Sequence, residues 1–181
     1  MAYNIADLFE HTADVVGDRV ALICGDTTLT FAELDSRANQ FAHHLQARGV
    51  QPGDHVGIYA VNSEPWVTAM LGSLKARAVP INVNYRYVEA ELSYLISNAD
   101  LVACVFDQEY APRLAAVIDE APALQTLVHI DDDSGADTSS LGSTSFEDAC
   151  AQSSPERTTT ERSGDDIYII YTGGTTGMPK G

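Results

Sequence analysis

Apolar residues near the start of the chain recur three or four positions apart, the spacing of one helix face. The stripe consists of Ile5, Leu8, Phe9, Ala13 and Val16. It predicts an amphipathic helix that ends at Gly17. The apolar run 20–24, the Gly25–Asp26 pair and the threonine-rich run that follows predict a small β-hairpin.

A second helix is indicated more strongly, because its start signal and its apolar stripe agree. Thr30 and Glu33 form the T-x-x-E pair of a capping box. The apolar residues that follow at helical spacing are Phe31, Leu34, Ala38, Phe41, Ala42 and Leu45. Gly49 and Pro52 should end this helix.

From residue 54 onward, short apolar runs alternate with helical stripes. Strands are predicted at 55–60, 79–83, 101–106 and 124–130. Three helices are predicted between them. The first starts at Asn62 or Ser63, the second carries an apolar stripe from Val88 to Ile96, and the third spans 112–120. Because helices rather than tight turns join successive strands, the predicted fold class is α/β, with a largely parallel sheet and helices on both faces.

The composition changes after Ile130, where serine, threonine, aspartate and glycine dominate. We therefore divide the chain into a partial N-terminal α/β subdomain (1–130), a surface excursion (131–165) and a strand with a glycine-rich loop (166–181). The excursion should be partly mobile, with one short helix capped by Thr144 with Glu147.

The charge balance excludes some kinds of partner. Twenty-six acidic residues face ten basic ones, for a formal net charge of -16, and the only lysines are Lys75 and Lys180. Such a chain is a poor candidate for binding nucleic acid or an anionic membrane surface. The acidic N-terminus is unlike a targeting peptide, and no apolar run approaches the length of a membrane span. We expect a cytoplasmic protein.

The cysteines and several polar clusters carry weaker signals. Cys24, Cys104 and Cys150 lack the spacing of a disulfide framework or a zinc site, so we expect them to be small buried hydrophobic residues.

The acidic run 131–133 lacks the spacing of a calcium loop and is expected to be a solvated loop. The adjacent His43 and His44 are expected to be surface or boundary residues. Trp66 is more typical of core than of a ligand platform. The serines at 139, 140 and 143 lack the nucleophile elbow of hydrolases.

The run Tyr171–Gly181, YTGGTTGMPKG, has the chemistry of a phosphate cradle. Glycines let backbone N–H groups approach an oxyanion, threonine hydroxyls add donors, and a lysine adds positive charge. The spacing fits neither a Walker loop nor the dinucleotide fingerprint. Five residues after Gly173 and Gly174 stand Met178 and Pro179, where a Walker loop needs a glycine.

This run resembles the signature loop of the adenylate-forming (AMP-binding) enzymes, a superfamily that includes acyl-CoA synthetases and the adenylation domains of peptide synthetases. The signature specifies all but one of these positions. The segments 29–45 and 74–86 are similar to the family's first and second core motifs, with Arg77 where glycine is usual. The Pro80–Asn82 run and Gly173 favour acyl-CoA ligases.

The resemblance implies that the chain is an incomplete N-terminal part of the family's large domain. Such enzymes join a carboxylic acid to AMP from ATP, and then pass the acyl group to a thiol, usually coenzyme A. The phosphates of ATP would be held by Thr172, Gly173, Gly174, Thr175, Thr176, Gly177 and Lys180. The Mg²⁺ ligand, the acyl pocket and the catalytic residues of the family lie downstream, so we assign no catalytic or metal-binding residue here and expect the reading frame to continue beyond Gly181.

Three functions remain open on this evidence. The first is an acyl-CoA synthetase of fatty-acid metabolism that acts on a hydrophobic carboxylic acid and requires the remainder of the enzyme chain. The second is an adenylation domain that loads a carrier protein. The third is a non-catalytic α/β association module. The sequence does not indicate an oligomeric state.

Overall fold

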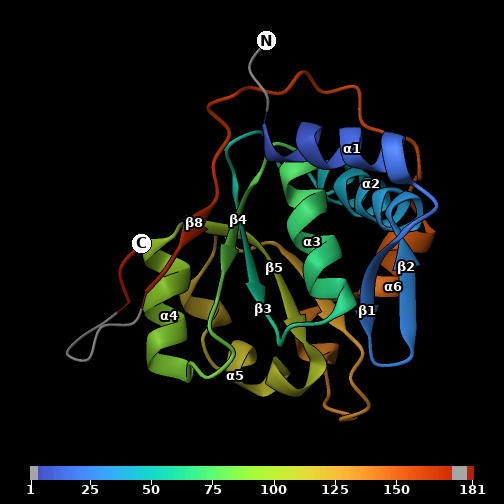
Figure 1. The fold of residues 1–181 in the computed structure, drawn as a ribbon. Helices are drawn as coiled ribbons and strands as arrows, with labels where there is room; N and C mark the ends of the chain where they lie inside the picture. The colour runs from blue at the N-terminus through green and yellow to red at the C-terminus, as the bar shows by residue number, and fades with distance from the viewer. Residues whose placement is uncertain (1–3, 173–178) are drawn as a thin grey trace.

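The computed structural model describes residues 4–172 and 179–181 (Figure 1). The helices are α1 (Ile5–Val16), α2 (Phe31–Ala47), α3 (Glu64–Lys75), α4 (Glu89–Asn98), α5 (Ala111–Ala115) and α6 (Phe146–Ala151). Short 3-10 turns are η1 (Gln108–Tyr110), η2 (Ile118–Glu120) and η3 (Ser139–Leu141). The strands are β1 (Val20–Cys24), β2 (Thr27–Thr30), β3 (His55–Tyr59), β4 (Val79–Asn82), β5 (Leu101–Asp107), β6 (Thr126–Ile130), β7 (Thr144–Ser145) and β8 (Ile169–Ile170).

Six of these strands form one parallel sheet, in the order β7-β6-β5-β3-β4-β8. The predicted α/β class is therefore confirmed. The hairpin of β1 and β2 is antiparallel and forms a separate two-stranded sheet, also as predicted.

Helices cover both faces of the parallel sheet, and each face has its own apolar core. Phe41 of α2, Ala69 of α3 and Phe146 of α6 pack with Ile58 and Val105 on one face. Leu92 of α4 and Leu114 of α5 pack with Cys104 and Phe106 on the other. Residues of β5 enter both cores, so this central strand is apolar from Leu101 to Phe106, as buried parallel strands usually are.

Local hydrogen bonds explain where the helices start. The Thr30 N–H donates to Glu33 Oε2 at 2.8 Å, and the Glu33 N–H donates to Thr30 Oγ1 at 3.2 Å, so the predicted capping box is present. Ser63 caps α3. The predicted helix near residue 145 is also present, but Ser145 rather than Thr144 caps it, because Thr144 pairs with Val128 as the first residue of β7.

The single helix predicted at 112–120 is wrong, because the structure contains α5 and the separate turn η2. Val117 leaves the helical region with φ −120° and ψ −8°. β-Branched Val117 and Ile118 have modest helix propensity, and Asp119 and Glu120 would place negative charge at a helix C-terminus. The local sequence therefore opposes a continuous helix.

The chain after α6 crosses the outside of α1 before it descends to β8, as the orange-to-red segment in Figure 1 shows. We call residues 152–166 the strap. Two of its arginines bind carboxylates of the first two helices. Arg157 contacts Asp14 and Asp35, and Arg162 contacts Asp7 and Glu10.

Lys75 lies under the strap, and its side chain is fully buried (0% exposed). Its ammonium group binds Glu10, and it donates to Asp35 Oδ1 at 2.7 Å. The cations of Lys75 and Arg162 offset the effect of burial on Glu10 and lower the pKa of that carboxyl to about 2. These ion pairs join α1, α2, α3 and the strap.

The cysteine prediction is correct for two residues of three. Cys104 and Cys150 are buried, whereas Cys24 is only half-buried because it ends an edge strand of the small hairpin. Among the described helices, none is both long enough and apolar enough to cross a lipid bilayer.

We expect Lys75→Met to lower the free energy of unfolding by about 3 kcal/mol, because it leaves buried carboxylates short of a cation. Urea denaturation at neutral pH measures this change. Arg19→Met is the matched control, since Arg19 is exposed and forms no ion pair among the described residues, and its effect should stay within about 0.5 kcal/mol. Equal effects of the two substitutions would contradict this role of Lys75.

Candidate functional site

The candidate loop leaves the sheet at the carboxyl end of β8, its outermost strand beside β4. Ile169 pairs with Ile81, and Ile170 pairs with Asn82. In a parallel sheet the carboxyl ends of all strands lie at one edge, which is where open α/β sheets commonly bind ligands. The sheet therefore delivers the start of the loop to a ligand-binding edge.

Thr172 and Lys180, which flank the glycine-rich stretch, lie opposite each other as an antiparallel pair. The Thr172 N–H donates to the Lys180 carbonyl at 2.9 Å, and the Lys180 N–H donates to the Thr172 carbonyl at 3.2 Å. The other predicted phosphate-binding residues, Gly173, Gly174, Thr175, Thr176 and Gly177, lie outside the described residues. The two described members of the predicted site are thus brought together as the two ends of one loop.

Tyr171 fixes the base of this loop to α4. Its hydroxyl donates to Asn98 Oδ1 at 2.8 Å, and its ring packs against the apolar core on that face. Gly181 lies directly on the same ring, and a Cβ at this position would come within 2.6 Å of it. A side chain at the final position of the motif would therefore displace the Tyr171 ring.

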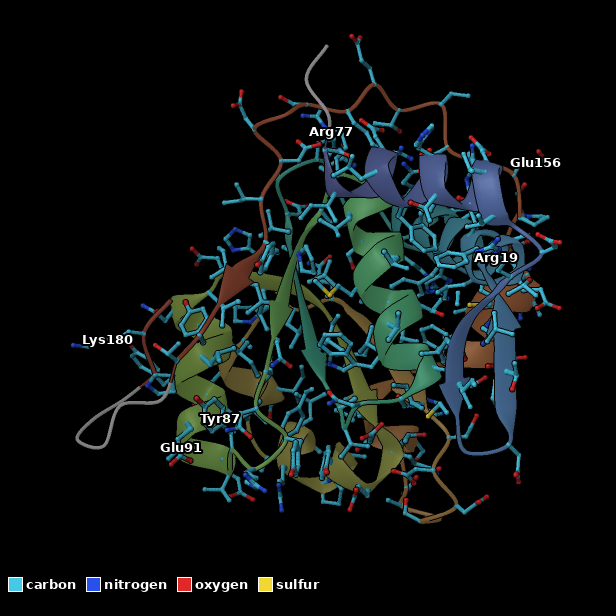
Figure 2. All side chains as sticks on the ribbon, in the orientation of Figure 1. Arg19, Arg77, Tyr87, Glu91, Glu156 and Lys180 are labelled. Carbon is cyan, nitrogen blue, oxygen red and sulfur yellow. The ribbon has the colours of Figure 1, made fainter. Side chains whose placement is uncertain are left out.

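Lys180 is exposed, and Figure 2 shows its side chain directed away from the body of the molecule. Within residues 4–172 and 179–181 it forms no ion pair. By contrast, five other basic residues bind carboxylates: Arg37, Lys75, Arg77, Arg157 and Arg162. In so acidic a chain, Lys180 is a cation that the described residues leave available for an anionic ligand.

The strand order reverses direction between β3 and β5, since β3 connects towards β4 and β5 connects towards β6. A crevice is expected at such a switch point. Here Asp107, at the end of β5, accepts the Val61 N–H at 2.7 Å, which joins the segments that follow β3 and β5. Burial raises the pKa of Asp107 to about 6. An internal hydrogen bond thus lies at the switch point, whereas the candidate loop starts at β8.

A small apolar cavity of about 150 Å³ lies beside β8, between the sheet and α3. Trp66, Met70 and Tyr168 contribute to its wall. Trp66 is half-buried and packs against the core, in agreement with the prediction that it is a core residue. As the only tryptophan of the chain, it is an intrinsic fluorescent reporter close to β8.

The competing polar clusters show little sign of a second site. In the described part of the chain, no group of three potential ligands could hold a metal ion, so the run 131–133 is not a metal site there. Ser143 Oγ lies 2.8 Å from His129 Nδ1, which joins the turn before β7 to β6. The prediction for His44 is wrong, because its side chain is buried against Phe41, and burial lowers its pKa to about 4.

Several contacts that shape the site were not predicted from the sequence. These are the Tyr171–Asn98 hydrogen bond, the packing of Gly181 on Tyr171, and the ion pair of Arg77 with Asp166. Arg77 did carry a signal, because it occupies a motif position where glycine is usual.

Comparison with known proteins identifies the family. A family model described as AMP-binding enzyme matches residues 9–181. The chain belongs to the AMP-binding enzyme family. This membership agrees with the loop at β8 and with the fold.

Two relatives within the AMP-binding enzyme family are named as ligases. A medium/long-chain-fatty-acid–CoA/3-oxocholest-4-en-26-oate–CoA ligase of Mycobacterium marinum is 54% identical over 185 residues, covering 100% of this chain and 34% of the relative. A 3-oxocholest-4-en-26-oate–CoA ligase of Rhodococcus rhodochrous is 51% identical over 181 residues, covering 100% of this chain and 33% of the relative. The chain thus spans about one third of the length of these relatives.

A solved structure of a CoA ligase shows the same fold. The anthranilate CoA ligase AuaEII in complex with anthranoyl-AMP superimposes with a TM-score of 0.87 at 28% identity. The match covers 98% of this chain and 34% of that one.

The raised pKa of Asp107 predicts how the stability of the protein depends on pH. The folded pKa of Asp107, about 6, lies above the ordinary value of an aspartate, so the folded state binds the proton more tightly and stability falls as pH rises between these values. Above pH 6 the folded state must hold a buried carboxylate, and Asp107→Asn should then stabilise the protein by about 2 kcal/mol.

Urea denaturation of the wild type and of Asp107→Asn between pH 4 and pH 8 tests this expectation. The difference in the free energy of unfolding should be small at pH 4 and reach its full value above pH 6. A difference that does not change with pH would contradict the shifted pKa.

Proposed function

We propose that this chain is the N-terminal part of a longer ATP-dependent acyl-CoA synthetase, an acid–thiol ligase that forms AMP. The observation that carries the proposal is the closed pairing of Thr172 with Lys180 at the carboxyl end of β8. This pairing occurs in a chain that is more than half identical to proteins named as CoA ligases. The remainder of the enzyme would supply the acyl pocket and the catalytic residues.

The proposed role of the loop is to hold the β- and γ-phosphates of ATP. The residues assigned to this role are Thr172, Gly173, Gly174, Thr175, Thr176, Gly177 and Lys180. The backbone N–H groups of the glycines and the hydroxyls of the threonines donate hydrogen bonds, and the Lys180 ammonium group offsets the charge on the departing pyrophosphate. Holding these phosphates orients the α-phosphate for attack by the carboxylate.

The chemistry proceeds by two displacements. A carboxylate oxygen bonds to the α-phosphorus of ATP while the bond to pyrophosphate breaks, which gives an acyl-adenylate. The sulfur of coenzyme A then bonds to the acyl carbon while the bond to AMP breaks. The role proposed for the loop, phosphate binding and orientation, belongs to the first step only.

The described residues do not form a Mg²⁺ site, and we route no step through this ion. Mg²⁺ enters the proposal only as the usual companion of ATP phosphates. For the acid we propose a medium- or long-chain fatty acid or a steroid side-chain acid, because the relatives are named for such substrates. We also propose a cytoplasmic location and no nucleic-acid partner, in line with the net charge of -16.

ATP–pyrophosphate exchange by the full-length protein tests the proposal across a panel of carboxylic acids. We expect exchange with hydrophobic acids and little with short polar ones, and formation of the acyl-CoA when coenzyme A is added. Exchange without any acyl-CoA would favour the loading of a carrier protein. No exchange with any acid would contradict the proposal.

Lys180→Ala tests the role of the loop. We expect the kcat/KM of adenylation to fall about 100-fold, because a cation that stabilises the departing pyrophosphate is lost. Arg19→Ala removes an exposed cation far from the loop and is the matched control, with no expected change. Equal rates for the two variants would contradict the role assigned to Lys180.

A further inference from the structure

Arg77, in the turn between α3 and β4, has a backbone conformation that is unfavourable for arginine. Its φ is +61°, in the left-handed region, and the other non-glycine residues described with positive φ are Asp100 and Asp133. Aspartate enters this region with little difficulty, whereas long side chains do not. Such strain persists only where the surrounding structure holds the residue in place, and it often marks a functional position.

The side chain of Arg77 supplies the contacts that hold it. Its Nη2 and Nε donate to Asp166 at 2.9 to 3.2 Å, and its Nη1 donates to the Glu161 carbonyl at 3.0 Å. Asp166 also accepts hydrogen bonds from Asn4 Nδ2 at 3.0 Å and from the Ser163 N–H at 3.1 Å. A planar two-point contact of this kind fixes orientation as well as distance.

This ion pair lies at the amino-terminal ends of two neighbouring strands. Arg77 precedes Ile81 of β4 by four residues, and Asp166 precedes its partner Ile169 of β8 by three. Figure 2 shows Arg77 at the end of the sheet where the strap passes, with Lys180 in a separate part of the view. The ion pair therefore joins the start of β4 to the segment that enters β8.

The register of β8 needs an additional contact of this kind, because the sequence of the strand specifies the register only weakly. β8 has two residues, and its sequence from Ile167 to Tyr171 is continuously apolar, so no alternation marks which side chains face the core. In the structure Ile169 packs against the core, whereas Ile170 is 55% exposed. A slip of one residue in the pairing with β4 would exchange these faces. It would also displace Thr172, which lies two residues beyond the end of the strand.

We propose that Arg77 is a positioning residue that fixes the register of β8 against β4 and, through it, the place of Thr172 at the start of the candidate phosphate-binding loop. The Arg77–Asp166 ion pair acts at one end of β8, and the Tyr171–Asn98 hydrogen bond acts at the other. The effect on ATP rests on the proposed function, whereas the effect on register does not.

A charge swap in the full-length protein tests the proposal. Arg77→Asp and Asp166→Arg should each raise the KM for ATP in pyrophosphate exchange about tenfold, because small displacements of binding groups are costly. The KM for the carboxylic acid should stay unchanged. The double variant should recover most of the affinity for ATP, since aspartate tolerates positive φ and the opposite charges are restored.

Two further variants separate positioning from general stability. Arg77→Gly removes the ion pair but also relieves the left-handed strain, so its melting temperature should stay near that of the wild type while the KM for ATP still rises. Asp14→Asn breaks an ion pair of Arg157 on the same strap and is the matched control, with an unchanged KM for ATP.

Hydrogen exchange measures the register independently of activity. In Arg77→Gly, the amide of β8 that is hydrogen-bonded to β4 should exchange faster, while those of β5 keep wild-type protection. Unchanged exchange in β8 would overturn the proposal, as would a KM for ATP that the swap does not restore. If the wild type itself shows no pyrophosphate exchange, the proposed function fails, and hydrogen exchange alone decides the role of Arg77.

Discussion

The arrangement of the molecule depends most on the ion pairs that the buried ammonium group of Lys75 forms. A lysine with 0% exposure must be paired, and Glu10 and Asp35 provide the pairing from α1 and α2. Arg157 and Arg162 of the strap bind the same carboxylates, so the strap is fixed by the same set of charges. The path of the chain from α6 to β8 therefore follows from charges buried beneath it.

Ion pairing also determines which cations are left for a ligand. Five of the ten basic residues are bound to carboxylates inside the described structure, and Lys180 is not among them. In a chain with a net charge of -16, long-range electrostatics alone would repel ATP. A phosphate site must then rely on short-range donors in one loop, which is what the motif from Thr172 to Lys180 contains.

The alternation of strands and helices could be predicted because it depends on local patterns. The capping box of Thr30 and Glu33 and the apolar run of β5 are examples. The contacts of Arg77, Arg157 and Arg162 could not be predicted, because their partners lie about 90 to 150 residues away and leave no local signal. In the candidate site, the prediction from the sequence rested on the glycines, threonines and lysine of the motif. The Thr172–Lys180 pairing and the packing of Gly181 on Tyr171 depend on tertiary structure instead.

The most direct test of the account is a crystal structure of the full-length protein with bound ATP. We predict that the β- and γ-phosphates lie within hydrogen-bond distance of Lys180 Nζ and of the loop that starts at Thr172, at the carboxyl end of β8. Phosphates bound at another strand end, such as the switch point between β3 and β5, would contradict this assignment.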